Sequence, residues 1–540
     1  MSDATQNGPM LAADGRPLKA SLRRALRRQK MRALMLIAPL LIFILITFIA
    51  PIADMLFRSV ENNIVSDTLP RTVEALDDWE YASGETPGEP VFDAMFVDLF
   101  IAAERKEHTR LGSRLNYQET GISSLFRQTG RDVEDMAEVY EDQFDALNEI
   151  WRDGAFWAEL MGDPDWFAEA QGAEDAGPRF RINDEMEDRL PRTAEAYRVF
   201  ARFTQNEDED NPASERPWPL VHAMLYADLT DGAAIDAYTG FGAEELTAAK
   251  EAVPGFEAPT YREAFLEVDE DWASVEMWGT IKAYSGEFTS GYFLNAVDRE
   301  LTPHGIETLP SDQSVYLKLF WRTIWMSLTI TFMTILLGYP VAYLLANLPM
   351  RKSSLLMILV LLPFWTSLLV RTSAWKVLLQ QQGVINDILV WAGILSDSGR
   401  LVMINNQLGT IIAMTHILLP FMILPLYSVM ATIPPSFVRA SKSLGATNWT
   451  TFWRVYFPQS VPGIGAGSIL VFILAIGYYI TPALVGGTDG IFISNRIAYH
   501  ISSSLNWGLA AALGSILLAA VLVLYWAYDR IVGIDNVKLG

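Results

Sequence analysis

The chain has 540 residues, a formal net charge of −23 and no cysteine. Without cysteine it has no disulfide framework, no thiolate-ligated zinc site and no cysteine nucleophile. The charge is unevenly distributed, because residues 58–311 carry a net charge of −35 and the remaining residues a net charge of +12. This division excludes a single soluble globule, and the acidic balance argues against a nucleic-acid-binding protein.

Six apolar segments are candidates for membrane-spanning helices, each of which needs about 20 mostly apolar residues. The first is 33–57, which follows a basic segment at 1–32. The other five are expected at about 320–346, 354–374, 408–431, 461–484 and 507–530. The first apolar run exceeds the core of a secretory signal peptide and lacks a small-residue cleavage site, so we interpret it as an uncleaved anchor. The sequence thus predicts an all-α integral membrane protein with six transmembrane helices.

Lysine and arginine in the short loops predict the orientation, because they favour the cytoplasmic side. Eight of them precede the first span, Arg351 and Lys352 follow the second, and three more lie in the loop 432–460. These loops alternate along the chain, so both termini, including the tail 532–540, are expected in the cytoplasm. The acidic segment 58–311 is then expected on the periplasmic side, between the first two spans.

The acidic segment has the composition of a folded domain. It contains seven tryptophans, and its apolar residues from Val133 to Trp151 recur at helical spacing. Residues 93–110 and 192–204 are also predicted to be helical, and turns or boundaries are expected at 84–90, 211–219 and 301–310. The acidic run 207–210 could collect cations, but a solvated loop is favoured. We therefore predict a mainly helical inserted domain.

Motifs for catalysis are missing from the sequence. It contains no nucleophile elbow, no zinc-protease motif and no phosphate-binding loop, and its histidines lack metal-ligand spacing. We expect no catalytic residue, no metal site and no cofactor in this chain, and therefore not an enzyme.

The loop after the fourth span contains a short predicted helix. The two prolines Pro434 and Pro435 end the span, Ser436 is the expected N-cap, and Gly445 suits a sharp helix exit. Phe437 and Leu444 would lie on one face together with Ala440. A cytoplasmic helix of this kind offers a contact surface for a partner.

This loop resembles the EAA loop of binding-protein-dependent ABC importer permeases, whose pattern is Glu-Ala-Ala-x3-Gly-x9-Ile-x-Leu-Pro. Ala440, Gly445 and Pro458 match the pattern, and apolar Val455 and Phe457 replace its Ile and Leu. Arg439 stands in place of the Glu, which reverses the charge, and Ser441 in place of the second Ala. The resemblance runs from about 315 to 531 and is nearest to the spermidine/putrescine permease subfamily. The segments that suggest the subfamily are 337–344, 362–371, 383–386, 419–427 and 479–487. The inserted domain has no counterpart in this resemblance.

The resemblance implies a permease subunit in a bacterial inner membrane, surrounded by lipid. Its expected partners are a second permease, two ATP-binding subunits that use ATP and Mg²⁺, and a periplasmic substrate-binding protein. Transport would proceed by alternating access. The residues expected to couple transport to the ATPase are Arg439, Ala440, Ser441, Leu444, Gly445 and Ala446.

Candidate residues of the translocation path are Trp365, Arg371, His416, Tyr478 and Tyr479. Polar residues within a membrane are functional candidates, although His416 could equally be bonded to a neighbouring helix, and Arg371 could only anchor its span at the interface. The small-residue spacing of Gly463 and Gly467 favours helix packing over substrate contact.

The resemblance favours import of polyamines. Another small solute, such as ferric iron, thiamine or a phosphonate, is the first alternative. An anchored periplasmic receptor or assembly protein is a second alternative, which the spacing of the coupling loop disfavours. The charge of the insert suggests that it concentrates polycations or docks a binding protein.

Overall fold

The computed structural model describes residues 18–173, 175–311 and 313–532. The chain divides into two compact units. The first contains the described residues up to Glu61, Ser290–Asp298 and the residues from Leu309 onward, and the second contains Asn62–Thr289 and Arg299–Thr308. The beginning of the basic segment predicted at 1–32 and residues 533–540 of the tail predicted at 532–540 lie outside the described residues.

Five helices of the first unit are long and apolar enough to cross a membrane: Gln29–Arg58, Tyr316–Asn347, Gln407–Thr432, Asn448–Gly477 and Trp507–Arg530. The first consists of α1 (Leu18–Ile44) and α2 (Ala50–Arg58), joined by the π-helical turn Leu45–Ile49. The second and third are α17 (Tyr316–Asn347) and α21 (Gln407–Thr432). The fourth joins α23 (Asn448–Thr451) through a π-helical turn to α24 (Phe457–Gly477), and the fifth lies in α27 (Trp507–Val532).

The prediction of a single straight helix at 354–374 is wrong. The chain instead forms α18 (Met350–Leu361) and α19 (Leu368–Leu378), bent by 96° about the 3-10 turn Leu362–Trp365. Pro363 has no N–H to continue the helical ladder, and the Ser367 side chain starts α19 by accepting a 3.2 Å hydrogen bond from the Val370 N–H. There are six spans among the described residues only if this bent pair counts as one.

The helix predicted at 461–484 is also interrupted. Helix α24 ends at Gly477, and α25 (Ile480–Val485) begins after two intervening residues. The carbonyl oxygens freed at the break are bonded, since Tyr478 O accepts a hydrogen bond from Ser494 Oγ at 2.8 Å and Tyr479 O accepts one from Asn495 Nδ2 at 2.7 Å. Both donors lie on α26 (Ile493–Ser502). Hydrogen bonds to α26 therefore stabilise the interruption between α24 and α25.

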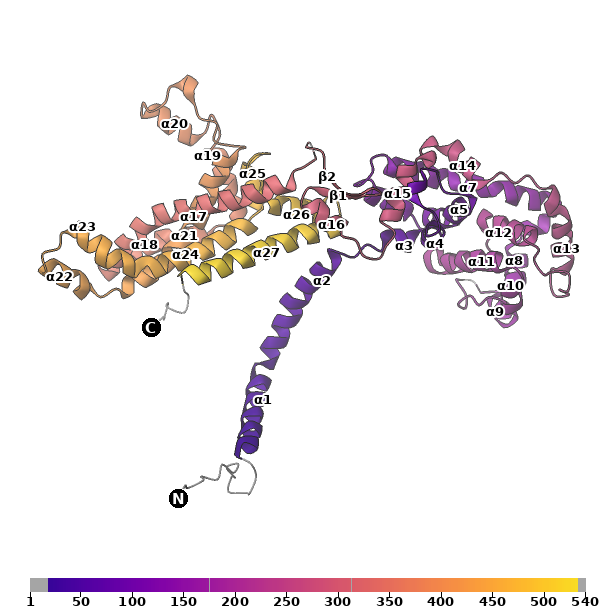
Figure 1. Cartoon of the computed structure of the whole chain (residues 1–540), viewed down its shortest axis with the longest axis horizontal. Helices are drawn as coiled ribbons and strands as arrows, with labels where there is room; N and C mark the ends of the chain where they lie inside the picture. Colours follow the sequence, from indigo (N-terminus) through magenta and orange to yellow (C-terminus); the bar gives the residue numbers. More distant parts are fainter. Residues whose placement is uncertain (1–17, 174, 312, 533–540) are drawn as a thin grey trace, which may run out of the picture. The chain divides into compact units, whose positions relative to one another are not determined.

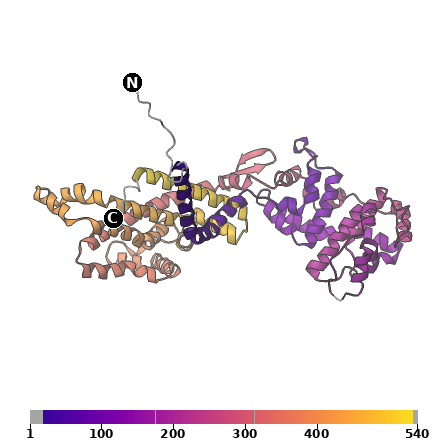
Figure 2. The same cartoon turned by 90° about the horizontal axis from the view of Figure 1, so that it is seen from below.

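Helices α17, α21 and α24 lie side by side and bury the core of the first unit, as both views show (Figures 1 and 2). Glycine lets two of them approach closely. A Cβ on Gly463 would lie 3.1 Å from Val429 Cβ and 3.2 Å from Leu426 Cα, and a Cβ on Gly467 would lie 2.6 Å from Met422 Sδ. The packing role expected for these glycines is confirmed. Three further short helices of the unit are α16 (Gly291–Ala296), α20 (Val384–Trp391) and α22 (Pro435–Ser443).

The second unit is mainly helical, as predicted. Its one described sheet is an antiparallel hairpin of β1 (Arg299–Thr302) and β2 (Gly305–Thr308), where only turns were expected. Its helices are α3 (Ile64–Thr68), α4 (Pro70–Leu76), α5 (Glu89–Glu104), α6 (His108–Leu115), α7 (Ile122–Leu147), α8 (Gly154–Met161), α9 (Pro164–Ala170), α10 (Asp184–Arg189), α11 (Pro191–Phe203), α12 (Pro219–Thr230), α13 (Ala243–Ala252), α14 (Tyr261–Val268) and α15 (Val275–Ala283).

Two predicted helices of this unit differ in detail. The apolar series that begins at Val133 lies on α7, but Trp151 does not, because the helix ends at Leu147 and Asn148 takes an extended backbone. The helix predicted at 93–110 is divided between α5 and α6, and Lys106 between them has a φ of 58°, which no helix continues through.

Tryptophans hold the core of the second unit together. Trp151, Trp157, Trp272 and Trp278 are fully buried. Two of these tryptophans donate hydrogen bonds to the backbone carbonyls of the other two. Trp157 Nε1 donates to Trp151 O at 2.8 Å, and Trp278 Nε1 donates to Trp272 O at 2.9 Å. Buried indole N–H groups that are satisfied in this way mark a specifically packed core.

The two ends of the second unit are tied to each other. The Asn62 N–H donates to Glu287 O at 2.8 Å, and the Asn62 side-chain amide donates to Tyr284 O at 2.7 Å and Gly286 O at 3.1 Å. The chain therefore enters and leaves the segment Asn62–Thr289 at neighbouring points, before it returns to the second unit at Arg299–Thr308.

Candidate coupling surface and membrane path

Helix α22 begins differently from the prediction. Pro434 occupies the N-cap position and Pro435 the first helical position, so Ser436 lies inside the helix and its predicted role as N-cap is wrong. Proline is favoured at the first helical position because its missing N–H would have no partner there and its φ is already helical. The double proline thus ends α21 and starts α22.

The exit of α22 is a Schellman motif centred on Gly445. Gly445 has a φ of 85°. The Gly445 N–H donates to Lys442 O at 3.0 Å, and the Ala446 N–H donates to Ser441 O at 3.2 Å. These are the two hydrogen bonds that define the motif, and they require the left-handed backbone that glycine adopts without steric cost. The glycine exit expected from the sequence is confirmed.

A second set of contacts fixes α22 against the next helix. Thr447 caps α23 by accepting a 3.2 Å hydrogen bond from the Thr450 N–H. Ser441 Oγ lies 3.0 Å from Thr451 Oγ1, which joins α22 to α23 directly. Ser441 therefore faces inward and supports the helix pair, while its neighbours Arg439 and Ala440 are exposed.

The outer side of this helix pair is apolar and basic. Phe437, Leu444 and Trp449 are 50%, 89% and 71% exposed. Arg439 makes no ion pair within the part of the chain that the structure describes. We call the exposed residues Phe437, Arg439, Ala440, Leu444, Gly445 and Trp449 the coupling surface. Large apolar side chains gathered on an exposed surface mark an interaction site.

Sequence reasoning missed two aromatic residues beside this surface. Trp449 and Trp453 are both exposed, and their ring centroids lie 5.6 Å apart. Their i, i+4 spacing in the loop 432–460 was the available signal, since it places both rings on one helix face.

The candidate path residues fall on four separate elements. His416 lies on α21, and its Nδ1 accepts a 3.0 Å hydrogen bond from Trp375 Nε1 on α19. Tyr478 and Tyr479 lie in the break between α24 and α25, whereas Trp365 ends the 3-10 turn and is 72% exposed. Arg371 on α19 buries its Nε without a hydrogen-bond partner. The bond to Trp375 matches the alternative in which His416 is held by a neighbouring helix, and a role in translocation stays a prediction for all five residues.

Known proteins match the part of the chain that contains these elements. The family described as binding-protein-dependent transport system inner membrane component matches residues 313–532. The spermidine/putrescine transport system permease protein PotB of Haemophilus influenzae is 35% identical over 220 residues, which cover 40% of this chain and 76% of that protein. The inner membrane ABC transporter permease protein YdcU of Escherichia coli is 32% identical over 276 residues, which cover 48% of this chain and 86% of that protein.

One solved structure of similar fold is a bacterial ABC transporter involved in the import of the acidic polysaccharide alginate. It is 20% identical, with a TM-score of 0.33 and coverage of 41% of this chain and 80% of that chain. The family assignment depends on the sequence relatives, at 35% identity over three quarters of a curated permease. The chain therefore belongs to the inner membrane components of binding-protein-dependent transport systems, the multi-pass permease subunits of ABC importers.

Proposed function

We propose that this chain is a permease subunit of an ATP-driven importer of polyamines such as spermidine and putrescine. The observation that carries the proposal is the 35% identity over 220 residues to a permease named for those two substrates. No comparable relationship supports ferric iron, thiamine or a phosphonate among the relatives described above. The receptor alternative is disfavoured because it gives the exposed coupling surface no partner.

The proposed complex contains a second permease, two ATP-binding subunits and a periplasmic binding protein. ATP and Mg²⁺ belong to the ATP-binding subunits, since this chain has no phosphate-binding loop. The loop charges favour cytoplasmic termini and a periplasmic insert. Lipid or the second permease covers the span Gln29–Arg58, none of whose apolar window is buried within the chain.

The coupling surface is the proposed contact with an ATP-binding subunit. Phe437, Leu444 and Trp449 would fill an apolar groove of that subunit, and Arg439 would meet an acidic rim. Closure of the ATP-binding subunits would then move α22 as a rigid body, because the Schellman motif and the bond between Ser441 and Thr451 fix its exit. The bundle would switch its open side in response, as a two-state element biased from both ends.

Uptake of labelled putrescine and spermidine into vesicles that carry the complete complex tests this function. Saturable uptake is expected only with ATP and the binding protein present. A complex with an inactive ATP-binding subunit is the control. If the complex hydrolyses ATP in response to its binding protein but takes up neither polyamine, the substrate assignment is wrong.

A further inference from the structure

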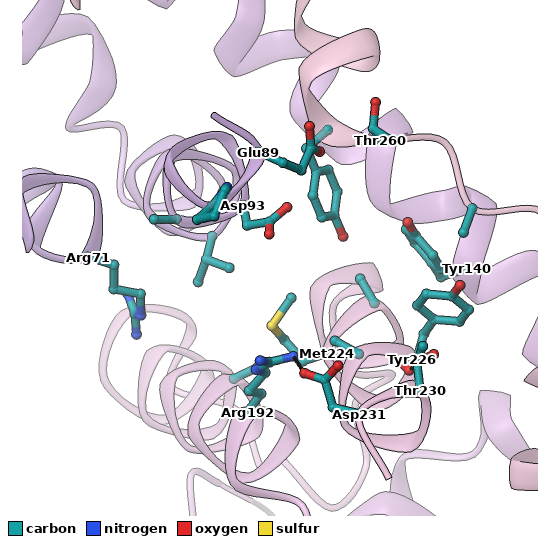
Figure 3. Close-up of a pocket in the computed structure, with 18 of the residues that line it drawn as sticks. Arg71, Glu89, Asp93, Tyr140, Arg192, Met224, Tyr226, Thr230, Asp231 and Thr260 are labelled. Atoms are coloured by element: carbon teal, nitrogen blue, oxygen red, sulfur yellow. Dashed lines mark hydrogen bonds and ion pairs between the residues drawn. The ribbon is translucent and has the colours of Figure 1, made fainter. Parts of the chain in front are cut away.

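The second unit contains a cavity of about 600 Å³ that the transport mechanism does not use. Residues of α4, α5, α7, α11 and α12 line it, together with the segment 258–261 that leads into α14 (Figure 3). Its volume lies within the range of small-molecule binding sites. All its lining residues belong to one compact unit.

The charges that line the cavity do not cancel. Two arginines and four carboxylates line it, which leaves an excess of two negative charges. Arg71 pairs with Asp98 at 2.9 Å and also with Glu195. Arg192 pairs with Asp231 at 2.7 Å. Both lining arginines are thus already in ion pairs, and the lining carboxylates that pair with neither arginine are Glu89 and Asp93.

Glu89 and Asp93 lie one turn apart on the same face of α5. Glu89 accepts a 3.2 Å hydrogen bond from the Arg262 N–H, whereas Asp93 has no hydrogen bond or ion pair among the described residues. Although Asp93 is still exposed to solvent, partial removal of its carboxylate from water, and secondly the charge of Glu89, raise its pKa to about 6. Binding of a cation beside such a carboxylate stabilises its charged form.

The other walls of the cavity are aromatic and aliphatic. Tyr140 and Tyr226 lie with their ring centroids 4.8 Å apart, and Tyr261 stacks on Phe96 at 4.1 Å, which fixes its orientation. Figure 3 shows the Asp93 carboxylate pointing into the space that Tyr140, Tyr226 and Met224 border. Tyrosine rings attract cations, and the aliphatic side chains suit a methylene chain.

We propose that this cavity binds an aliphatic diamine, with an ammonium group held between Glu89 and Asp93 and its methylene chain lying against the tyrosines and Met224. A dication balances the excess charge of the lining. Anions are disfavoured because both arginines are already paired. No group of three metal-ligand side chains occurs among the described residues, which disfavours a metal ion. The site depends on the cavity alone and not on the proposed transport function, although the two share a class of ligand.

Calorimetric titration of putrescine into the purified full-length chain in detergent tests the site. Changing Glu89→Gln together with Asp93→Asn is expected to raise the Kd about tenfold or more, because each charge-assisted contact contributes on the order of tenfold. The matched control is Glu134→Gln with Glu138→Gln. These two residues have the same spacing on α7, are exposed and do not line the cavity. The control makes the same change of net charge and should move the Kd less than about twofold.

Several outcomes would overturn the proposal. Absence of saturable putrescine binding to the unchanged chain is one. An equal loss of affinity in the cavity variant and in the control would show attraction by surface charge alone. Equal binding of the neutral analogue 1,4-butanediol would exclude recognition of the ammonium group. Circular dichroism of both variants establishes that they are folded. Because no transport is measured, failure here leaves the proposed transport function untouched, and failure of uptake leaves this site untouched.

The pH dependence of binding gives a second test that requires no substitution. As pH falls through about 6, Asp93 takes up a proton and loses its charge, so the affinity for putrescine should fall. Bound ammonium lowers this pKa and shifts the midpoint below that of the empty cavity. The groups near Asp93 are Glu89, Arg192, Asp231, Tyr140 and Tyr261. Arginine does not titrate in this range, and burial raises the pKa of both tyrosines further above it. A profile unchanged by Asp93→Asn would contradict the assignment.

Discussion

Replacing Gly445 with valine is expected to reduce polyamine uptake by about tenfold or more while leaving the chain folded. A Cβ at this position would have no atom within 4 Å, so the cost is one of backbone conformation and not of steric contact. At a φ of 85° a β-branched residue is strained by about 1–2 kcal/mol, enough to change an equilibrium about tenfold. Both hydrogen bonds of the Schellman motif would weaken, and the coupling surface would lose its fixed shape.

The matched control for this variant is Gly445→Asn, because asparagine tolerates a left-handed backbone better than other side chains. It should retain most of the uptake. ATP hydrolysis stimulated by the binding protein is measured beside uptake in the same vesicles. If valine and asparagine at 445 gave equal uptake, the left-handed exit of α22 would have no part in coupling.

A leucine in place of Gly463 is expected to disrupt the packing of α24 against α21. The first added carbon alone would lie 3.1 Å from Val429 Cβ and 3.2 Å from Leu426 Cα, and the rest of the side chain has no space. Overpacking of this kind costs about 1–3 kcal/mol or more. The midpoint of thermal unfolding should fall by roughly 5 °C, and less protein should reach the membrane.

Ala466→Leu is the control for that variant, since Ala466 is exposed on the same helix, whereas Gly463 is buried. It adds a side chain of similar size at an exposed position. Thermal unfolding of each purified chain, followed by helical circular dichroism in one detergent, compares them. An equal loss of stability in both variants would assign the effect to helix propensity or to detergent and not to the contact between the two helices.

The features predictable from sequence were those encoded by neighbouring residues. Apolar runs located the spans, and helical spacing located α7 and α11. Gly445 alone was enough to predict the exit of α22. The bend between α18 and α19 was missed because hydropathy measures apolarity and not direction, and Pro363 alone does not separate a kink from a break. Ser436 was wrongly predicted as the N-cap because the helix begins earlier, with Pro435 at its first position.

The cavity in the second unit could not be predicted, for a different reason. Its lining comes from positions between 71 and 261, and only the packing of several helices brings them together. Glu89 and Asp93 share their spacing with Glu134 and Glu138, so the sequence contains two equivalent acidic pairs. Only the fold shows that one pair borders a cavity and the other faces solvent.

The bonds from Asn62 to the chain around Tyr284 bear on how such a protein could arise. A segment whose ends are tied together can be spliced into a gene at one site without separating the residues on either side of that site. The permease helices then keep their own contacts, and the inserted segment keeps its own tryptophan core. An ancestor could have gained this folded domain in one recombination event, and selection could afterwards alter its surface independently of the membrane helices.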